Sequence, residues 1–234
     1  DTDVYPTSIF LIGAKGGSTT QLPEIAEADS ERWHGLADAN LRLADMDASG
    51  IDVQLLMLTC PGVQMFDADT ACGLAASSND ELAAVIAKHP TRFSGLAAFA
   101  PQAPQAAVVE IERAVNRLKL KGALVNSHIQ GRYMDDPFFW PIFEACEALG
   151  VPVYLHPNTP SKQLIQPFLE AGLDGAVYGF GVETGLHLLR LIVKGVFDRF
   201  PKLQVIVGHC GEALPFWMFR LDYMHGAGVR SQRY

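Results

Sequence analysis

Long hydrophobic runs, paired cysteines and an excess of basic residues are all missing from this sequence. No apolar stretch approaches the roughly 18 residues that a membrane-spanning helix needs, and no signal peptide is visible. The four cysteines, Cys60, Cys72, Cys146 and Cys210, have no CxxC spacing, which favours free thiols in a reducing compartment. The formal net charge of -8 argues against nucleic acid or an anionic membrane as a partner, because clustered Lys and Arg bind both. We therefore expect a cytoplasmic protein without either partner.

The chain does contain a regular alternation of short apolar runs and helical patterns. Its 234 residues, 49% of them hydrophobic, are enough for one sizeable core, and α/β barrels of this length are usually one domain. The apolar runs predict strands near residues 51–58, 93–99, 122–126, 151–156 and 203–208. Helical patterns lie near residues 31–50, 68–89, 104–119, 137–149, 180–199 and 212–225. Strands that are apolar on both faces and alternate with helices predict an α/β fold with a parallel sheet.

Residues 1–30 differ from the rest of the chain. They are rich in Gly, Ser and Thr and show no clear periodicity, so we interpret them as an irregular N-terminal insertion. The stretch GAKGGST within them lacks the spacing of a phosphate-binding P-loop, and we expect no nucleotide binding there. Residues 31–234 are then the domain built from strands and helices.

Polar residues stand where several of the predicted strands end. Thr59, the stretch 126–128 (Asn-Ser-His), His156 and His209 all occupy such positions. In a parallel barrel the C-terminal ends of the strands surround the active site. A histidine at one strand end is more often structural than functional, but here two successive units end on one. Histidine is also the commonest metal ligand and is suited to proton transfer near neutral pH. We therefore predict that His156 and His209 share one site.

Glu212 follows His209 by three residues, in the stretch GHCGEALP. We expect it in the first turn of the next helix, where the helix dipole favours a carboxylate. From there it could bind one imidazole nitrogen and fix the tautomer of the histidine. The alternative is a glutamate that only begins a helix.

Other charged residues lie within apolar surroundings. Glu183, His187 and Arg190 follow one another along an apolar helical pattern, and Glu183 and His187 are four residues apart, so they share a helix face. A polar pair that braces this helix is a better interpretation than catalysis. Arg42 and Arg220 are embedded among apolar residues, and such a charge requires a partner. That partner is either an aspartate of the protein or a carboxylate of the substrate.

Long stretches of the chain resemble one enzyme family. The stretches VPVYLHP, VETGLHLLRL and GVFDRFPKLQVIVGHCGEALPFWMFRLD are similar to the metal-dependent, non-oxidative decarboxylases of the amidohydrolase superfamily. These include the aminocarboxymuconate semialdehyde and γ-resorcylate decarboxylases. Three further stretches, LADMDASGIDVQLLMLTCPGVQMFDADTA, GRYMDDPFFWPIFEA and GFGVETGLHLLRLI, resemble the 5-carboxyvanillate branch most. The resemblance implies a (β/α)8 barrel around a divalent metal, Mn or Zn. It also implies a carbon-carbon lyase that releases carbon dioxide from a hydroxylated aromatic carboxylic acid.

The resemblance assigns roles to particular residues. It makes His156 a metal ligand and His209 a catalytic residue oriented by Glu212. Arg42 and Arg220 match arginines that contact the substrate carboxylate or neighbouring polar groups. Thr59, at a strand end, is predicted to join them as a substrate-binding residue.

The chain also departs from the family pattern. The first-strand pair of metal ligands, the seventh and eighth strands and the metal-binding aspartate are not evident, so we expect an incomplete barrel that by itself is inactive. Two alternatives remain open, a metal-dependent hydrolase of a lactone or amide and a metal-free binding subunit. The aromatic stretches PFFWPIF and ALPFWMF predict a homodimer or homotetramer, because large apolar patches usually mark association sites.

Overall fold

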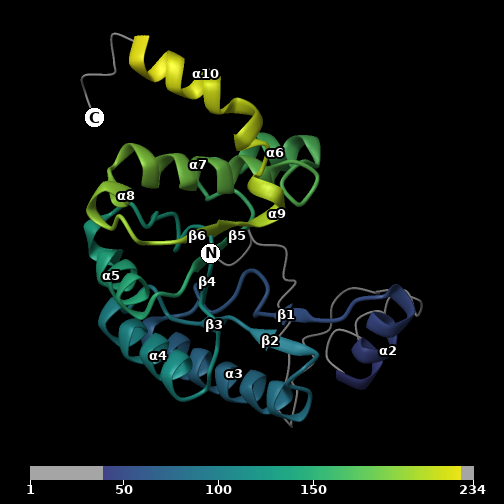
Figure 1. The fold of residues 1–234 in the computed structure, drawn as a ribbon. Helices are drawn as coiled ribbons and strands as arrows, with labels where there is room; N and C mark the ends of the chain where they lie inside the picture. The colour runs from purple at the N-terminus through teal and green to yellow at the C-terminus, as the bar shows by residue number, and fades with distance from the viewer. Residues whose placement is uncertain (1–38, 228–234) are drawn as a thin grey trace.

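The apolar runs and helical patterns do fold into parallel strands and helices. The computed structural model of the chain describes residues 39–227, and Figure 1 shows its elements. The strands are β1 (Gln54–Leu56), β2 (Phe93–Gly95), β3 (Ala97–Ala98), β4 (Ala123–Asn126), β5 (Val153–His156) and β6 (Val205–Val207). The helices are α2 (Ala39–Ser49), α3 (Ala68–Lys88), α4 (Pro104–Asn116), the 3-10 helix η1 (Pro137–Phe139), α5 (Trp140–Leu149), α6 (Gln166–Ala171), α7 (Gly179–Val193), α8 (Val196–Arg199), α9 (Gly208–Gly211) and α10 (Leu214–Ala227). The α/β class is confirmed, whereas the predictions for residues 1–38 lie outside the described residues.

The strands follow one another in chain order across the fold. β1 pairs with β2, and β3, β4, β5 and β6 pair successively, all in parallel. Leu96 splits the run predicted at 93–99, because its N–H donates to the carbonyl of Leu56 in β1, whereas the N–H of Ala97 donates to Gly122 before β4. One apolar run thus pairs with β1 at its start and with β4 at its end. Among the strands that the structure describes, the series does not close into a barrel.

The two faces of the sheet differ in burial. Successive side chains of a strand point to opposite faces, and Val125 and Leu155 point into the main hydrophobic core. Figure 1 shows α3, α4 and α5 along this side of the strands. Tyr154, His156 and Ile206 point to the other face, where Ile206 is 41% exposed. The face that carries His156 is therefore partly open at β5 and β6, whereas at β4 the same face is buried, with Leu124 3% exposed.

The aromatic stretches lie in different environments. In PFFWPIF, Phe139 and Phe143 are buried in the core, whereas Phe138 is 42% exposed, so this stretch supplies only part of the predicted aromatic surface. ALPFWMF is exposed as predicted, with Phe216 at 82% and Phe219 at 85% on α10. Figure 1 shows α10 beyond α7 at one end of the fold. No helix within residues 39–227 is long and apolar enough to cross a membrane.

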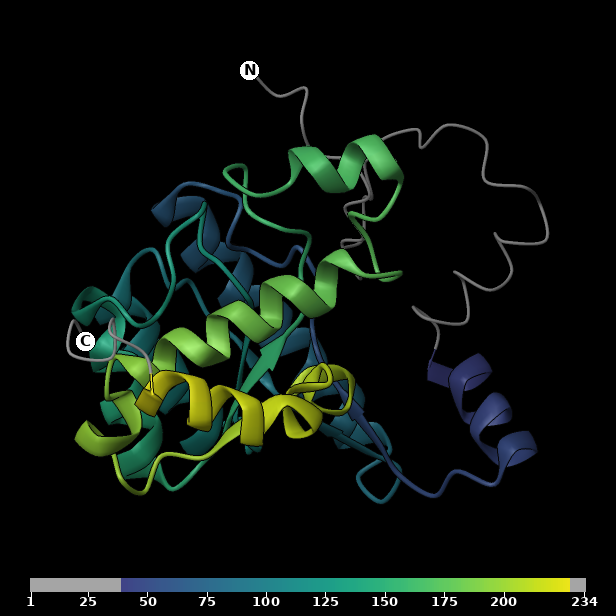
Figure 2. The same cartoon turned by 90° about the horizontal axis from the view of Figure 1, so that it is seen from above.

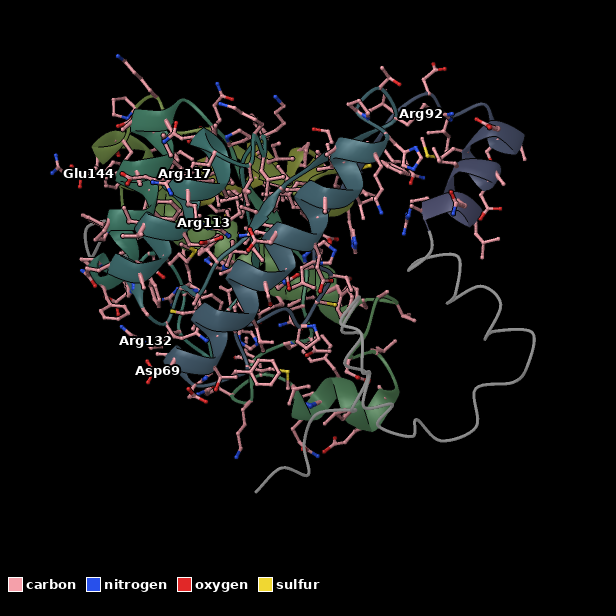
Figure 3. All side chains as sticks on the ribbon, turned by 90° about the horizontal axis from the view of Figure 1, so that it is seen from below. Asp69, Arg92, Arg113, Arg117, Arg132 and Glu144 are labelled. Carbon is pink, nitrogen blue, oxygen red and sulfur yellow. The ribbon has the colours of Figure 1, made fainter. Side chains whose placement is uncertain are left out.

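Ion pairs link neighbouring elements at the surface, and Figure 3 labels two of the arginines involved, Arg92 and Arg113. Arg113 of α4 lies 2.6 Å from Asp80 of α3. Arg92, just before β2, lies 2.6 Å from Asp47 near the end of α2. Exposed pairs of this kind contribute about 0–1 kcal/mol each.

Candidate active site at the ends of the strands

The structure brings His156 and His209 together at one edge of the sheet. His156 is the last residue of β5, and His209 follows the end of β6 by two residues. Their ring centroids are 5.8 Å apart and the rings are nearly perpendicular. Gly208 allows this approach, because a Cβ atom there would lie 2.7 Å from Cδ of Pro157. The two histidines that the sequence singled out are therefore neighbours.

The tautomer of His156 follows from its hydrogen bond. Its Nδ1 lies 2.8 Å from the carbonyl oxygen of Pro157, and a carbonyl oxygen only accepts. Nδ1 therefore carries the proton, and Nε2 keeps a lone pair. Burial lowers the pKa of His156, the carbonyl of Pro157 opposes that shift, and the nearby His209 adds to it. The ring is thus held neutral with one nitrogen available to a cation, as a metal-binding histidine requires.

Glu212 contacts the other histidine. Its Oε1 lies 2.9 Å from Nδ1 of His209, although the two atoms are not aligned as a hydrogen bond and Oε1 is a buried atom without one. Burial raises the pKa of Glu212, and the contact with His209 partly offsets that rise. The second oxygen packs on α7, because a Cβ atom at Gly181 would lie 2.9 Å from it. The ring of Phe180 stacks on His209 at 6.2 Å.

The expected place of Glu212 in the first turn of a helix is wrong. Its φ is 49°, and all residues from 209 to 213 have positive φ, between 47° and 83°. α9 is accordingly a left-handed turn, and α10 begins only at Leu214. Among these residues only Gly211 adopts such φ values without strain; each of the others costs about 1–2 kcal/mol. The left-handed turn, and not a helix dipole, is therefore what brings the carboxylate of Glu212 to His209.

Amide side chains from distant segments surround the end of β4. Gln64, in the loop after β1, accepts from the N–H of Asn126 at 2.6 Å and donates to the carbonyls of Asn126 and His128 at 3.0 Å each. Asn158, two residues after His156, also donates to the carbonyl of Asn126, at 3.3 Å. Gln64 and Asn158 were not predicted. No local pattern marks Gln64, because its partners lie 62 and more residues away in sequence.

The three predicted substrate-binding residues lie in different places. Thr59 is half-buried after β1, and its carbonyl accepts from the N–H of Gly62 at 3.0 Å. Arg42 is half-buried on α2 and donates to Oε1 of Gln54 at 3.1 Å. Arg220 is exposed on α10, so the expectation that apolar residues embed it is wrong for the described part of the chain. Figures 1 and 2 both show α2 apart from α9, which carries His209.

The polar residues of α7 form a buried network, as the structural interpretation predicted. Glu183 and His187 are both 0% exposed. Glu183 accepts from the hydroxyl of Ser127 at 3.3 Å, the hydroxyl of Tyr133 at 3.1 Å and the N–H of Ser161 at 3.2 Å. These bonds fix the segments that follow β4 and β5 against α7, and they hold Ser127 at its positive φ of 47°.

Arg190 extends the same network outward. Its guanidinium binds both oxygens of Asp135, at 2.8 and 2.9 Å, and lies over the ring of Tyr133 at 4.7 Å. A paired arginine of this kind is structural, which agrees with the bracing role that we predicted for this helix.

A complete metal site is not formed by the described residues. Within 39–227, no group of three or more His, Cys, Asp or Glu side chains could hold a metal ion. His156 has the tautomer of a ligand, but a divalent cation takes four or more donors. The described part of the chain therefore fits one position of such a site and not the whole of it.

Comparison with protein-family models gives one match over almost the whole chain. A model described as "Amidohydrolase" matches residues 9–229. The chain belongs to the amidohydrolase family. Several similar proteins of known structure share its fold. One of them is the 5-carboxyvanillate decarboxylase of Novosphingobium aromaticivorans, solved with bound manganese, which is 53% identical to this chain with a TM-score of 0.87. That alignment covers 91% of this chain and 62% of the other.

Other amidohydrolase relatives are also decarboxylases. The 2,6-dihydroxybenzoate decarboxylase of Rhizobium is 40% identical with a TM-score of 0.82, over 86% of this chain and 65% of the other. The γ-resorcylate decarboxylase of Polaromonas sp. is 42% identical over 196 residues, which are 80% of this chain and 60% of that protein. The chain thus spans about three fifths of the length of these relatives.

Proposed function

We propose that this protein is a carbon-carbon lyase that removes carbon dioxide, without oxidation, from a hydroxylated aromatic carboxylic acid resembling 5-carboxyvanillate. The observation that carries the proposal is the pair of adjacent strand-end histidines. One of them, His156, has a free Nε2, and the other, His209, is bound to a carboxylate. The decarboxylases to which the chain is similar support the choice of substrate class.

The proposed cofactor is a divalent metal, Mn or Zn. His156 would hold it through Nε2, because Nδ1 is occupied by the carbonyl of Pro157. Among residues 39–227, no group of three or more His, Cys, Asp or Glu side chains completes the site around it. A metal held there would supply Lewis-acid chemistry to the site.

His209 is the proposed catalytic residue for proton transfer. Decarboxylation replaces the carboxylate on a ring carbon with a proton while the carbon-carbon bond breaks and carbon dioxide leaves. We assign the delivery of this proton to an acid beside the metal, and we assign to His209 the removal of the phenolic proton of the substrate, a role that needs a fixed orientation. Glu212 would supply the orientation, because its Oε1 lies 2.9 Å from Nδ1 of His209 and leaves Nε2 outside that contact.

Arg42, Thr59 and Arg220 are the proposed substrate-binding residues. An arginine binds a carboxylate through two parallel hydrogen bonds, which suits an anionic aromatic acid. For Arg220 the support is its exposure on α10, and for Thr59 it is its position after the end of β1. For Arg42 the support is the resemblance of its surrounding sequence.

The proposed assembly is a homodimer or homotetramer, with neither nucleic acid nor a membrane as partner. α10 carries exposed apolar side chains around its whole circumference, among them Phe216, Phe219 and Tyr223 at 82%, 85% and 62% exposure. A helix that is apolar on every side is normally covered by protein. Light scattering should therefore report an oligomer, and Phe216→Glu should shift it toward monomer. A monomeric wild type at micromolar concentration would contradict the assembly.

We also propose a cytoplasmic location and a chain divided into an irregular segment, 1–30, and a catalytic domain, 31–234. The four cysteines are free thiols, as expected of a protein in a reducing compartment.

The test of function is carbon dioxide release from 5-carboxyvanillate by the purified protein with Mn²⁺, with His156→Ala as the control. The proposal predicts release by the wild type and loss of both release and bound metal in the variant. Hydrolysis of an aromatic lactone or amide without carbon dioxide release would establish a hydrolase instead. Wild-type protein that binds the acid, but binds no metal and does not convert the acid, would indicate a binding subunit.

A further inference from the structure

Four aromatic rings follow one another across the candidate site. The rings of Tyr154 and His156 are stacked, with centroids 6.1 Å apart and planes 27° apart. The ring of His209 is nearly perpendicular to His156 at 5.8 Å, and Phe180 stacks on His209 at 6.2 Å. Rings at centroid separations of about 4.5–7 Å attract one another in such arrangements. The candidate metal ligand therefore has two ring neighbours, and one of them, Tyr154, has no role in the proposed function.

The sheet holds Tyr154 on the face that carries His156. The two residues are two positions apart on β5, so their side chains point to the same face. β5 pairs with β4 on one edge and with β6 on the other, and the partners of Tyr154 in this register are Leu124 and Ile206. The backbone of Tyr154 is therefore fixed by two neighbouring strands.

The far end of the Tyr154 side chain lies against Gly208. A Cβ atom at Gly208 would be 3.3 Å from the hydroxyl oxygen of Tyr154. Gly208 follows the last residue of β6 and immediately precedes His209. The side chain of Tyr154 thus reaches from its own strand to the start of the left-handed turn, and contacts at both ends restrict the movement of its ring.

The ring of His156 needs such a neighbour, because its hydrogen bond alone does not fix its plane. Nδ1 donates to the carbonyl of Pro157 at 2.8 Å, which determines the tautomer. The terminal torsion of a histidine side chain has a broad energy minimum, so the ring can still tilt about this one bond. A stacked ring opposes the tilt, and Nε2 then keeps one direction.

We infer that Tyr154 is a positioning residue, whose stacked ring holds the imidazole of His156 with Nε2 directed to the metal site. The ring and not the hydroxyl group produces this effect, because the stacking involves the ring alone. Loss of a group that orients a metal-binding histidine typically lowers metal affinity by a factor of about 10–100. The inference rests on the proposed function, because that function makes His156 a metal ligand.

NMR spectroscopy of the histidine rings tests the inference without metal or turnover. Proton–nitrogen correlations of the metal-free protein at about pH 8, where imidazole is neutral, show which ring nitrogen carries the proton, and His156→Gln identifies the signals of His156 by their loss. In the wild type His156 should carry its proton on Nδ1 alone. Tyr154→Leu removes the ring but keeps an apolar side chain, and it should show both tautomers in exchange. Tyr154→Phe should keep the wild-type signals.

Tyr133→Leu is the matched control, because Tyr133 also contacts a histidine ring. Its centroid lies 5.2 Å from that of His187, and its hydroxyl donates to Glu183 in the buried network. Tyr133→Leu should therefore lower stability in urea at least as much as Tyr154→Leu, and should leave the tautomer of His156 unchanged. If Tyr154→Leu does not fold, Tyr154→Met takes its place with the same expectation.

Titration with Mn²⁺ gives a second measurement on the same proteins. The dissociation constant for Mn²⁺ should rise about tenfold in Tyr154→Leu, the lower end of the effect of losing an orienting group. It should stay unchanged in Tyr154→Phe and in Tyr133→Leu, because both keep the ring that stacks on His156.

Each result decides between the inference and its rejection. A proton that stays on Nδ1 of His156 in Tyr154→Leu overturns the inference, and so does an unchanged dissociation constant for Mn²⁺ in that variant. Equal effects of Tyr154→Leu and either Tyr154→Phe or Tyr133→Leu also overturn it. Wild-type protein that binds no Mn²⁺, or binds it but releases no carbon dioxide from 5-carboxyvanillate, refutes the proposed metal site or reaction, while the tautomer of His156 still decides the role of Tyr154.

Discussion

His187 should make the fold sensitive to acid, because its buried ring has no room for a second proton. Nε2 accepts a hydrogen bond from the N–H of Met134 at 3.1 Å, and Nδ1 lies 3.3 Å from the hydroxyl of Ser127. An amide N–H can only donate, so Nε2 is unprotonated and the ring is neutral. A proton on Nε2 would place two donors against each other and leave a buried cation near Arg190.

The sign and size of the effect follow from the pKa. Burial, with smaller contributions from the charges of His128 and Arg190, lowers the pKa of His187 from 6.5 to about 3. Below 6.5 the unfolded chain therefore binds a proton that the folded chain does not, and stability is lost as the pH falls. The slope is about 1.4 kcal/mol per pH unit, and the total is at most about 5 kcal/mol. Such a loss is comparable to the whole stability of many domains.

Glu183 acts in the opposite direction within the same network. Burial raises its pKa above 4.5, opposed by its hydrogen bonds and by Arg190. The folded chain then keeps a proton that the unfolded chain releases, so the contribution of Glu183 to stability falls as the pH rises from 4.5 to that raised value. The effect of His187 must therefore be isolated with a variant.

Urea unfolding followed by circular dichroism, at several pH values below 6.5, provides the measurement. His187→Gln retains an acceptor for the N–H of Met134 but cannot titrate, so its stability should fall less steeply with acid than that of the wild type. The slope of the free energy of unfolding against pH should differ between the two proteins by an amount that approaches one bound proton, about 1.4 kcal/mol per pH unit. Equal slopes, or an NMR titration in which the His187 ring protonates near 6.5, would refute the reasoning.

Further substitutions test the site and its geometry. His156→Ala should lower metal content and carbon dioxide release together, as metal analysis and a release assay on one preparation would show. His209→Asn should keep the metal and lower the rate by about 10²–10⁴-fold, and Glu212→Gln should give a smaller loss in the same direction; loss of metal in His209→Asn would make His209 a ligand instead. Gly208→Ala should destabilise by about 1–3 kcal/mol in urea unfolding, because its Cβ would collide with Pro157. Gly73→Ala, on α3 with no atom near its Cβ position, should instead stabilise by about 0.5–1 kcal/mol, and equal effects of the two glycine changes would contradict the packing at the end of β6.

Much of the secondary structure could be predicted because its signals are local. The apolar runs contain β1 to β6, and α5 ends at Leu149 with Gly150, whose φ is 65°, as its C-cap, where the sequence predicted the end of that helix. The division of one predicted strand at Leu96 could not be foreseen. Both halves of that run are apolar, and the break arises because each half pairs with a different strand.

The sequence by itself determined that a histidine stands at the end of one strand and just after the end of another, because the position of a residue at the end of an apolar run is visible along the chain. Only the tertiary structure decided that Glu212 reaches His209 through a left-handed turn and that Asn126 pairs with His156. It alone also decided that Gln64 satisfies the end of β4. The physical reason is that periodicity depends on neighbours in sequence. Strand register and the pairing of buried polar groups depend on segments that meet only when the chain folds.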